Sequence, residues 1–374
     1  MTRKQEQEKI DKKWMRRCLV LARKGEGLCA PNPMVGSVIV DKKGNKIAEG
    51  FHKGVGTLHG EQSALANAKA SVKGGTLYVN LEPCRHTSKG RYSCAQAILD
   101  SGLKRVVFGA RDPIKGHGGG ASLLSRKGID VSGPVSEQEC LFLNRGFIKH
   151  SKVGTPYVIG KVAMSLNGSV STATGESKWI TSEESRADGR RYRTFCDGIL
   201  VGVNTVLQDN PKLTARSRTL AHDPVRIVLD SRLRTPVDSK LLPLLSESKA
   251  RVIIACVKGA SEKKIKRLES KGADVWQFTV GRKNAVPLKM LLKKLAKSGV
   301  LSLLVEGGPK VLGGFLGKKL VDELVIYTSP KLIVGGKNWL HGSELKKLNA
   351  APHLTRYGPE VKIGQDRKCI YRMS

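Results

Sequence analysis

The sequence predicts two α/β domains arranged one after the other along the chain. Over about the first 145 residues, apolar β-branched segments alternate with segments of helical periodicity, which predicts a three-layer α/β domain. Lys149 to Thr155 is polar and contains glycine, as a linker between domains commonly does. The alternation then restarts without repeating the first domain. We therefore predict one domain at residues 1–149 and a second at residues 150–374.

The elements of the first domain follow from apolar spacing and from turn residues. Ile10, Trp14 and Cys18 recur at helical spacing, and Gly25 and Gly27 end this first helix. In chain order, we predict a helix over 5–24, strands over 35–40 and 46–51, a helix over 60–70, a strand over 76–81, a helix over 94–99, a strand over 105–109, a helix over 121–126, a short strand over 129–131 and a closing helix over 137–148.

The second domain begins with a segment, Pro156 to Met164, that is apolar nearly throughout, as a strand buried on both faces would be. Further predicted elements are a helix over 183–195, strands over 198–202, 225–229 and 251–256, a helix over 288–297, a strand over 301–305, a helix over 310–316 and a strand over 323–328. Residues 330–374 are predicted to form a loop and closing strands.

Composition predicts a cytoplasmic protein. No apolar run approaches the roughly 20 residues that span a bilayer, so no membrane association is expected. Residues 1–17 are charged with both signs and lack the apolar core of a secretory signal. The eight cysteines are scattered without a close-spaced framework, which favours a reduced compartment. The sequence does not determine the oligomeric state, and a homo-oligomer is compatible with it.

The charge balance is strongly basic, with 66 Lys and Arg against 32 Asp and Glu and a formal net charge of +34. Such an excess is typical of nucleic-acid binding. The basic residues are nevertheless spread along the chain, and no basic ribbon interleaved with aromatic residues is present. We therefore expect anionic small substrates and no nucleic-acid partner. Anionic small substrates explain only part of this excess of charge.

One histidine, one glutamate and two cysteines carry the chemistry of the first domain. His59 and Glu61 start a predicted helix, Cys84 follows a predicted strand after Pro83, and Cys94 starts the next helix. A histidine and two cysteines can bind Zn²⁺ and leave a fourth position for water, which the metal acidifies. Glu61 is then available to move protons. The pattern is that of a zinc-dependent nucleobase deaminase.

Nine residues separate the two cysteines, whereas two do so in most deaminases of this kind. This loop carries His86, Lys89 and Arg91. His86 could compete as a metal ligand or face the substrate. Lys89 and Arg91 would suit a substrate phosphate, although exposed basic loop residues usually have no such specific role.

Several blocks of sequence resemble the bifunctional deaminase/reductase family of riboflavin biosynthesis. In the first domain these blocks are Pro31-Asn32-Pro33-Met34-Val35-Gly36, His59-Gly60-Glu61 and Leu81-Glu82-Pro83-Cys84-Arg85-His86. In the second they are 161–168, 175–181, 202–214 and 305–309. The resemblance runs in family order from about residue 12 to about residue 335. It departs in the loop 88–93 and at Asp112-Pro113-Ile114-Lys115.

This resemblance implies a cytidine-deaminase-like first domain and a dihydrofolate-reductase-like second domain that uses NADPH. It implies deamination of a phosphoribosyl pyrimidine and then reduction of its ribosyl group to ribityl. The residues implied to line the cofactor site are Ala163, Trp179, Thr205, Asp209, Gly308, Pro309, Lys310, Val311, Leu312, Gly313 and Gly314. Those implied to face the substrate are Ser177, Arg193, Leu213, Arg216 and Glu306.

Some of these assignments also make physical sense. The turn at Glu306-Gly307-Gly308 lies between a strand and a helix, where backbone N–H groups can bind a pyrophosphate. Arg193 and Arg216 suit a phosphate. Asp209 is the candidate proton source for the reduction, with Lys161 as the alternative. The competing hypothesis is a nucleic-acid-editing deaminase whose second domain binds RNA.

Overall fold

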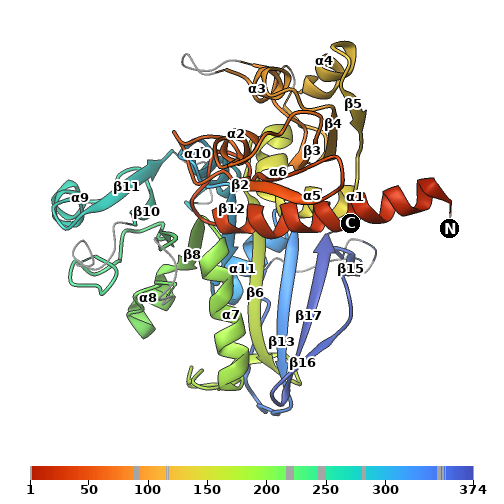
Figure 1. Cartoon of the computed structure of the whole chain (residues 1–374). Coiled ribbons are helices and arrows are strands. Elements are labelled where there is room, and N and C mark those ends of the chain that lie inside the picture. Colours follow the sequence, from red (N-terminus) through yellow and green to blue (C-terminus); the bar gives the residue numbers. More distant parts are fainter. Residues whose placement is uncertain are drawn as a thin grey trace. The chain divides into compact units, whose positions relative to one another are not determined.

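A computed structural model describes residues 2–86, 92–114, 116, 118–215, 223–242, 250–279, 284–342, 347, 349 and 351–373. The chain divides into two compact units, Met1–Gly154 and Thr155–Ser374 (Figure 1). The first five residues of the linker predicted over 149–155 are helical instead, because helix α6 continues to Val153 and ends at Gly154, a left-handed cap. The polar side chains that suggested a linker are instead half-buried or exposed on the surface of that helix.

The first unit is built on a five-stranded sheet of order β2-β1-β3-β4-β5. Strand β1 is antiparallel to β2 and β3, whereas β3, β4 and β5 are parallel. The strands are β1 (Gly36–Val40), β2 (Lys46–Phe51), β3 (Thr76–Leu81), β4 (Arg105–Ala110) and β5 (Asp130–Ser132). Because β3 and β4 are parallel, their carboxyl ends share one edge of the sheet.

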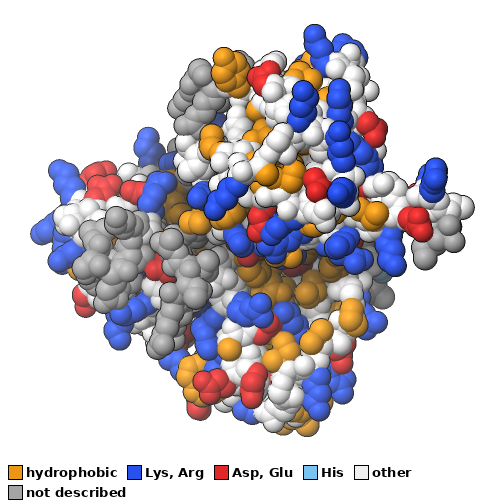
Figure 2. Space-filling view, in the orientation of Figure 1, with side chains coloured by type: hydrophobic (Ala, Val, Ile, Leu, Met, Phe, Trp, Pro, Cys, Tyr) orange, Lys and Arg blue, Asp and Glu red, His pale blue; other side chains and the backbone are white. Residues whose placement is uncertain are grey.

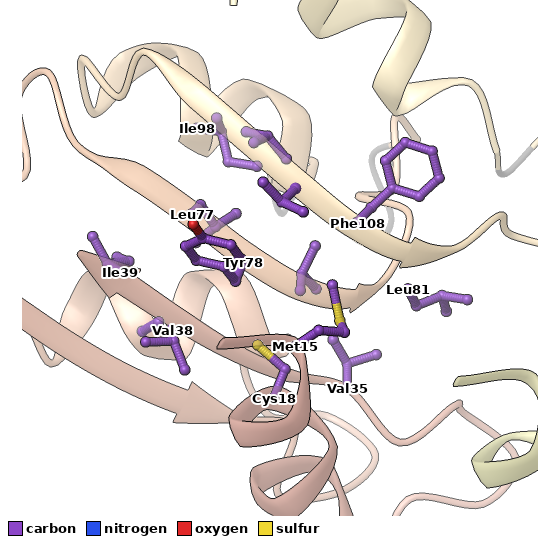
Figure 3. Close-up of a cluster of buried hydrophobic side chains, with 14 of the residues drawn as sticks. Met15, Cys18, Val35, Val38, Ile39, Leu77, Tyr78, Leu81, Ile98 and Phe108 are labelled. Carbon is purple, nitrogen blue, oxygen red and sulfur yellow. The ribbon is translucent and has the colours of Figure 1, made fainter. Parts of the chain in front are cut away.

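Helices cover both faces of this sheet. They are α1 (Arg3–Ala22), the short 3-10 helix η1 (Arg23–Gly25), α2 (Gly60–Ala66), α3 (Cys94–Asp100), α4 (Gly120–Arg126), α5 (Glu137–Leu143) and α6 (Arg145–Val153). Helix α1 contacts α5, whereas α3 contacts α2 and α4. Figure 3 shows Met15 and Cys18 of α1 packed with Val38, Tyr78 and Leu81 from the central strands. This burial of apolar side chains is the main term that stabilises the unit.

A buried ion pair ties α1 to the sheet. Both carboxylate oxygens of Asp11 accept hydrogen bonds from Arg105 at 2.8 and 2.9 Å, and the Tyr78 hydroxyl donates to Asp11 at 2.9 Å. Burial acts to raise the pKa of Asp11, but the hydrogen bonds from Arg105 and Gln7 outweigh it and lower this pKa. Asp11 is therefore ionised at neutral pH.

We expect Asp11→Ala to lower the free energy of unfolding by about 3 kcal/mol, because Arg105 would lose its buried partner. Asp130→Ala is the matched control. It also contacts Arg105, at 3.3 Å, but its side chain is 66% exposed, so its loss should cost less than about 1 kcal/mol. Since the pKa of Asp11 is lowered, its contribution is present above about pH 4 and disappears as pH falls further. Urea unfolding of the two variants at pH 7 and pH 3.5 measures both effects, and equal losses at pH 7 would contradict the prediction.

The second unit contains a ten-stranded sheet among its described residues, with the order β11-β10-β9-β8-β12-β6-β13-β17-β15 and β16 paired to β17. The seven strands from β11 to β13 in this order are parallel, and β17 is antiparallel to β13. The strands are β6 (Tyr157–Ser165), β8 (Gly198–Gly202), β9 (Val225–Leu229), β10 (Val252–Val257), β11 (Ala273–Phe278), β12 (Ser302–Val305), β13 (Glu323–Ser329), β15 (Leu354–Arg356), β16 (Val361–Ile363) and β17 (Asp366–Met373). A separate pair joins β7 (Ser169–Ser171) to β14 (Lys337–Asn338).

Two hydrophobic clusters fill the two faces of this sheet. One receives side chains from α10 (Leu288–Lys297) and α11 (Pro309–Leu316), the other from α7 (Glu183–Phe195), α8 (Val203–Asp209) and α9 (Glu262–Glu269). The unit is therefore a three-layer structure, and the α/β class predicted for the second domain is confirmed.

Several predicted boundaries were wrong. The helix predicted over 60–70 ends at Ala66, and the helix predicted over 137–148 is two helices that meet at Asn144. The side chain of Asn144 accepts from the backbone N–H of Met34 at 2.8 Å and donates to its carbonyl at 3.0 Å. Asn144 thus binds the backbone of the segment that leads into β1, and the predicted helix is interrupted at this residue.

No helix in the described part of the chain is long and apolar enough to cross a membrane. Basic side chains are dispersed over the face shown in Figure 2, among polar and hydrophobic ones, and form no single continuous patch there. The cluster at Lys263-Lys264-Ile265-Lys266-Arg267 is part of α9, whose apolar residues Ile265 and Leu268 are buried.

Candidate active sites

His59, the first predicted zinc ligand, is the N-terminal cap of helix α2. Its backbone is extended and the helix begins at the next residue, Gly60. A glycine is needed there because a Cβ at position 60 would lie 2.8 Å from the carbonyl oxygen of Val35. This close approach places the start of α2 against Val35, just before strand β1, and the imidazole of His59 is half-buried.

The two predicted cysteine ligands are joined through the first turn of α3. Cys84 lies just beyond the carboxyl end of β3, and Cys94 is the first residue of α3 after the Ser93 cap. The backbone N–H of Cys94 points to the sulfur of Cys84 at 3.4 Å, and that of Ala95 donates to the Cys84 carbonyl at 3.0 Å. N–H groups directed at a sulfur stabilise the thiolate that a metal requires.

These three residues converge on one point. Their ligand atoms all lie within 4.8 Å of one another, and the Nδ1 atom of His59 is 3.7 Å from the sulfur of Cys84 and 3.3 Å from that of Cys94. Tetrahedral zinc bonds of the usual lengths separate sulfur and nitrogen ligands by roughly 3.6 Å. The donor set and its spacing therefore fit Zn²⁺. No fourth histidine, cysteine or carboxylate joins this group among the described residues, which leaves a position for water.

Glu61 lies in the first turn of α2 and is almost fully buried, with 3% of its surface exposed. Burial, followed by the charge of Cys84, raises the pKa of Glu61 to about 7. The hydrogen bond from the Cys94 thiol lowers the pKa of Cys84 to about 4, with a further contribution from His59. A carboxyl group that titrates near neutral pH, beside a metal-binding group, is suited to accept and return protons.

His52, which the sequence did not single out, lies next to His59, and Asn32 lies next to His52. The ring of His52 is edge-on to that of His59, with 5.4 Å between their centroids, and is itself buried. The Asn32 amide nitrogen is 3.1 Å from the Nε2 atom of His52, and the Leu58 carbonyl is 3.0 Å from its Nδ1 atom. In the sequence, Asn32 stands out only as a member of the block 31–36, and an isolated histidine carries no spacing signal.

His86 is half-buried and is not part of the group of three ligands, so the alternative that it binds the metal is not supported. Lys89 and Arg91 lie outside the described residues. Their assignment to a substrate phosphate stays a prediction.

In the second unit, most of the predicted residues lie along three neighbouring parallel strands. Strands β8, β12 and β6 are adjacent in the sheet. Helix α8, with Thr205 and Asp209, follows β8, whereas Glu306 and the glycine turn follow β12. Ala163 is near the carboxyl end of β6. Ligands of open parallel sheets bind at this carboxyl edge.

Glu306 is held between two cations at this edge. Arg193 of α7 donates to one carboxylate oxygen at 2.6 Å, and the ammonium of Lys161 is 3.7 Å from the other. The Glu306 side chain is 8% exposed. Burial acts to raise the pKa of Glu306, but Lys161 and Arg193 outweigh it and lower this pKa. The sequence did not predict that Arg193 pairs with Glu306.

In the glycine-rich segment 307–314, the backbone is accessible at one glycine and covered by another part of the chain at a second. A Cβ at Gly308, the cap of α11, would meet nothing within 4 Å, so the backbone here is accessible. A Cβ at Gly313 would lie 1.9 Å from the carbonyl oxygen of His341, so this glycine accommodates another stretch of backbone. Leu312 is buried in the core. Lys310 is exposed, whereas Pro309, Val311 and Gly314 are half-buried.

Asp209 pairs with Lys178, which stands next to Trp179 in the loop that precedes α7. The Lys178 ammonium is 3.2 Å from the Asp209 carboxylate, and the two side chains are 56% and 36% exposed. Trp179 is 61% exposed, with the Arg186 guanidinium 4.2 Å from its ring centroid and Lys331 donating to its carbonyl at 2.7 Å.

The other residues predicted to face the substrate differ in their exposure to solvent. Ser177 is exposed in the same loop, and the Leu213 side chain is buried in the core. Arg216 lies outside the described residues. Sequence reasoning missed Arg234, which follows β9 and donates to the side chain of Asn204 on α8 at 2.9 Å. It adds an exposed cation next to the predicted cofactor residues.

Comparison with known proteins agrees with both halves of this description. Residues 8–110 match the family "Cytidine and deoxycytidylate deaminase zinc-binding region", and residues 156–363 match the "RibD C-terminal domain". The chain is 37% identical to the riboflavin biosynthesis protein RibD of Bacillus amyloliquefaciens over 377 residues, covering 97% of this chain and all of that protein. It is 34% identical to RibD of Escherichia coli, covering 96% of each.

Solved structures give the same result. A diaminohydroxyphosphoribosylaminopyrimidine deaminase/5-amino-6-(5-phosphoribosylamino)uracil reductase from Thermotoga maritima superposes with a TM-score of 0.86 at 31% identity, covering 98% of this chain and all of that one. RibD of Acinetobacter baumannii gives 0.84 at 31% identity, covering 98% and 99%. Because the second unit matches a reductase family, the hypothesis of an RNA-binding second domain is not supported. The chain belongs to the RibD family and is a bifunctional deaminase/reductase of riboflavin biosynthesis.

Proposed function

We propose that the first unit deaminates 2,5-diamino-6-ribosylamino-4(3H)-pyrimidinone 5′-phosphate and that the second reduces the ribosyl group of the resulting 5-amino-6-(5-phosphoribosylamino)uracil to ribityl. The observation that carries the first step is the convergence of His59, Cys84 and Cys94 beside the buried Glu61. The second step rests on the match to the reductase family and on the polar residues along the carboxyl edge of β8, β12 and β6.

In the deaminase step, His59, Cys84 and Cys94 would hold Zn²⁺. The metal would supply an acidified water as the nucleophile. Glu61 would take a proton from that water at its carboxylate, deliver it to a ring nitrogen of the pyrimidine, and later give a proton to the departing ammonia. The burial of Glu61 keeps bulk water from these transfers.

In the reductase step, the accessible backbone at Gly308 would bind the pyrophosphate of NADPH, with Ala163, Trp179 and Thr205 beside it. NADPH would supply the hydride. A cofactor with the additional 2′-phosphate is favoured by exposed cations at this edge, among them Arg234. Glu306 and Arg193 would orient the phosphoribosyl substrate.

Asp209 and Lys161 both remain candidates for the proton that accompanies hydride transfer. The Asp209 carboxylate is 3.2 Å from the ammonium of Lys178. The ammonium of Lys161 is 3.7 Å from the Glu306 carboxylate. We expect Asp209→Asn and Lys161→Met each to lower NADPH oxidation by about 10²-fold while ammonia release stays unchanged. Single-turnover NADPH oxidation with the aminouracil phosphate measures this step. A variant that keeps the wild-type rate rules its residue out as the proton source.

Anaerobic incubation with the diaminopyrimidinone phosphate, Zn²⁺ and NADPH tests the whole proposal, with ammonia and NADPH followed in the same sample. Ammonia should appear first and NADPH oxidation should follow it. NADPH oxidation without ammonia release would contradict the proposed order. We also propose a cytoplasmic location, which the eight cysteines support because all are described and none forms a disulfide.

A further inference from the structure

A buried carboxylate lies immediately before the Pro-Cys motif and does not take part in the chemistry described above. Glu82 follows strand β3 directly, and its side chain is 2% exposed. One of its oxygens accepts hydrogen bonds from the backbone N–H groups of Gly119 at 3.0 Å and Ala121 at 3.1 Å. The other is 3.4 Å from the backbone nitrogen of Asp112. The partners are thus mainly backbone groups at the start of α4, 37 and 39 residues further along the chain.

The start of α4 also touches the next residue of the motif. A Cβ at Gly120 would lie 1.8 Å from the carbonyl oxygen of Pro83. This distance is so short that only glycine fits, and the clash would be with backbone rather than with a flexible side chain. Glu82 and Pro83 are therefore held by the same turn of α4, one by hydrogen bonds and the other by close contact.

Cys84 is fixed from its other side by α3. As described above, the first N–H groups of α3 point to the sulfur and the carbonyl of Cys84. The segment Glu82-Pro83-Cys84 therefore lies between the first turns of two helices. The contact with α3 acts on Cys84 itself, whereas the contact with α4 acts through Glu82 and Pro83.

We propose that Glu82 is a positioning residue of the zinc site, which places the Cys84 sulfur by fastening the end of β3 to the start of α4. The inference rests on the ligand set proposed above. A metal ligand held in place keeps its ion longer than one whose backbone can move, and outer-shell substitutions commonly weaken metal binding by about 10- to 100-fold. The role requires an acceptor oxygen at this position, and the carboxylate supplies it.

The test measures zinc transfer from the purified full-length protein to a colorimetric chelator, with Glu82→Ala, Glu82→Gln and Gly120→Ala compared with wild type. We expect Glu82→Ala and Gly120→Ala to release zinc at least about 10-fold faster. Glu82→Gln should stay within about 3-fold, because its amide oxygen can still accept from Gly119 and Ala121. Cobalt substitution gives a second readout, in which the thiolate-to-cobalt absorption should shift in Glu82→Ala and not in Glu82→Gln.

Asp41→Ala is the matched control, since Asp41 also accepts two backbone N–H bonds with one oxygen, from Lys43 and Asn45 in the β1–β2 turn. It should release zinc at the wild-type rate, and NADPH oxidation should be unchanged in every variant. Wild-type release from Glu82→Ala, or equally fast release from Asp41→Ala, would overturn the inference. A wild-type protein that binds no zinc would instead overturn the ligand set.

Discussion

Replacing Glu61 by glutamine should lower the rate of ammonia release by about 10³-fold or more. Glutamine keeps the size of the side chain, but it cannot accept a proton from the water or return one to the leaving group. The buried position of Glu61 allows little access for a substitute base from solvent. Steady-state ammonia release with the diaminopyrimidinone phosphate measures the loss.

Two controls separate this loss from damage to the fold. The variant should retain one zinc per chain, because Glu61 is not among the three metal-binding residues. It should also oxidise NADPH normally when the deaminated substrate is supplied. Glu49→Gln removes another partly buried carboxylate of the same unit, paired with Arg17 at 2.6 Å, and should change ammonia release by less than about 3-fold. Ammonia release that survives in Glu61→Gln would show that another group moves the protons.

The largest effect in the second unit is expected from Glu306→Gln, which should lower NADPH oxidation by about 10²-fold or more and leave ammonia release intact. The Glu306 carboxylate pairs with both Lys161 and Arg193 at the edge where the substrate is proposed to bind. A neutral amide leaves two neighbouring cations without their shared counter-charge, so both should move. Substrate orientation depends on groups held to within about 1 Å.

Glu323→Gln is the matched control for this variant. Glu323 is also a buried carboxylate on a strand of the same sheet, but it is the first residue of β13 and lies 3.4 Å from the Tyr157 hydroxyl at the opposite edge. We expect NADPH oxidation by Glu323→Gln to stay within about 3-fold of wild type. Similar losses in the two variants would indicate that any buried carboxylate of this sheet supports the fold, and that Glu306 has no specific role.

The zinc group and the central strands were predictable because their signals are local. Each zinc ligand is recognisable from its own neighbours, His59 by Glu61 two residues on and Cys84 by Pro83 before it. Strands such as Ile199 to Val201 are buried on both faces, and a continuous apolar run marks them. Helices α7 and α10 have the residue bounds that were predicted.

The parts that were missed depend on contacts remote in sequence or on weak patterns. Glu82 accepts hydrogen bonds from backbone N–H groups at the start of α4. Because every residue type except proline has this group, the sequence of α4 does not reveal the contact. Helix α9 was missed because only Ile265 and Leu268 mark its apolar face among charged residues. The pairing of Arg193 with Glu306 joins residues 113 apart, which no local pattern reports.

Each set of site residues comes from a single unit. The metal-binding group and Glu61 belong to Met1–Gly154, and the pairs around Glu306 belong to Thr155–Ser374. A substitution in one set of site residues therefore leaves the residues of the other set unchanged. In genetic terms, we expect a mutation in one set to complement a mutation in the other when two copies of the chain are expressed together.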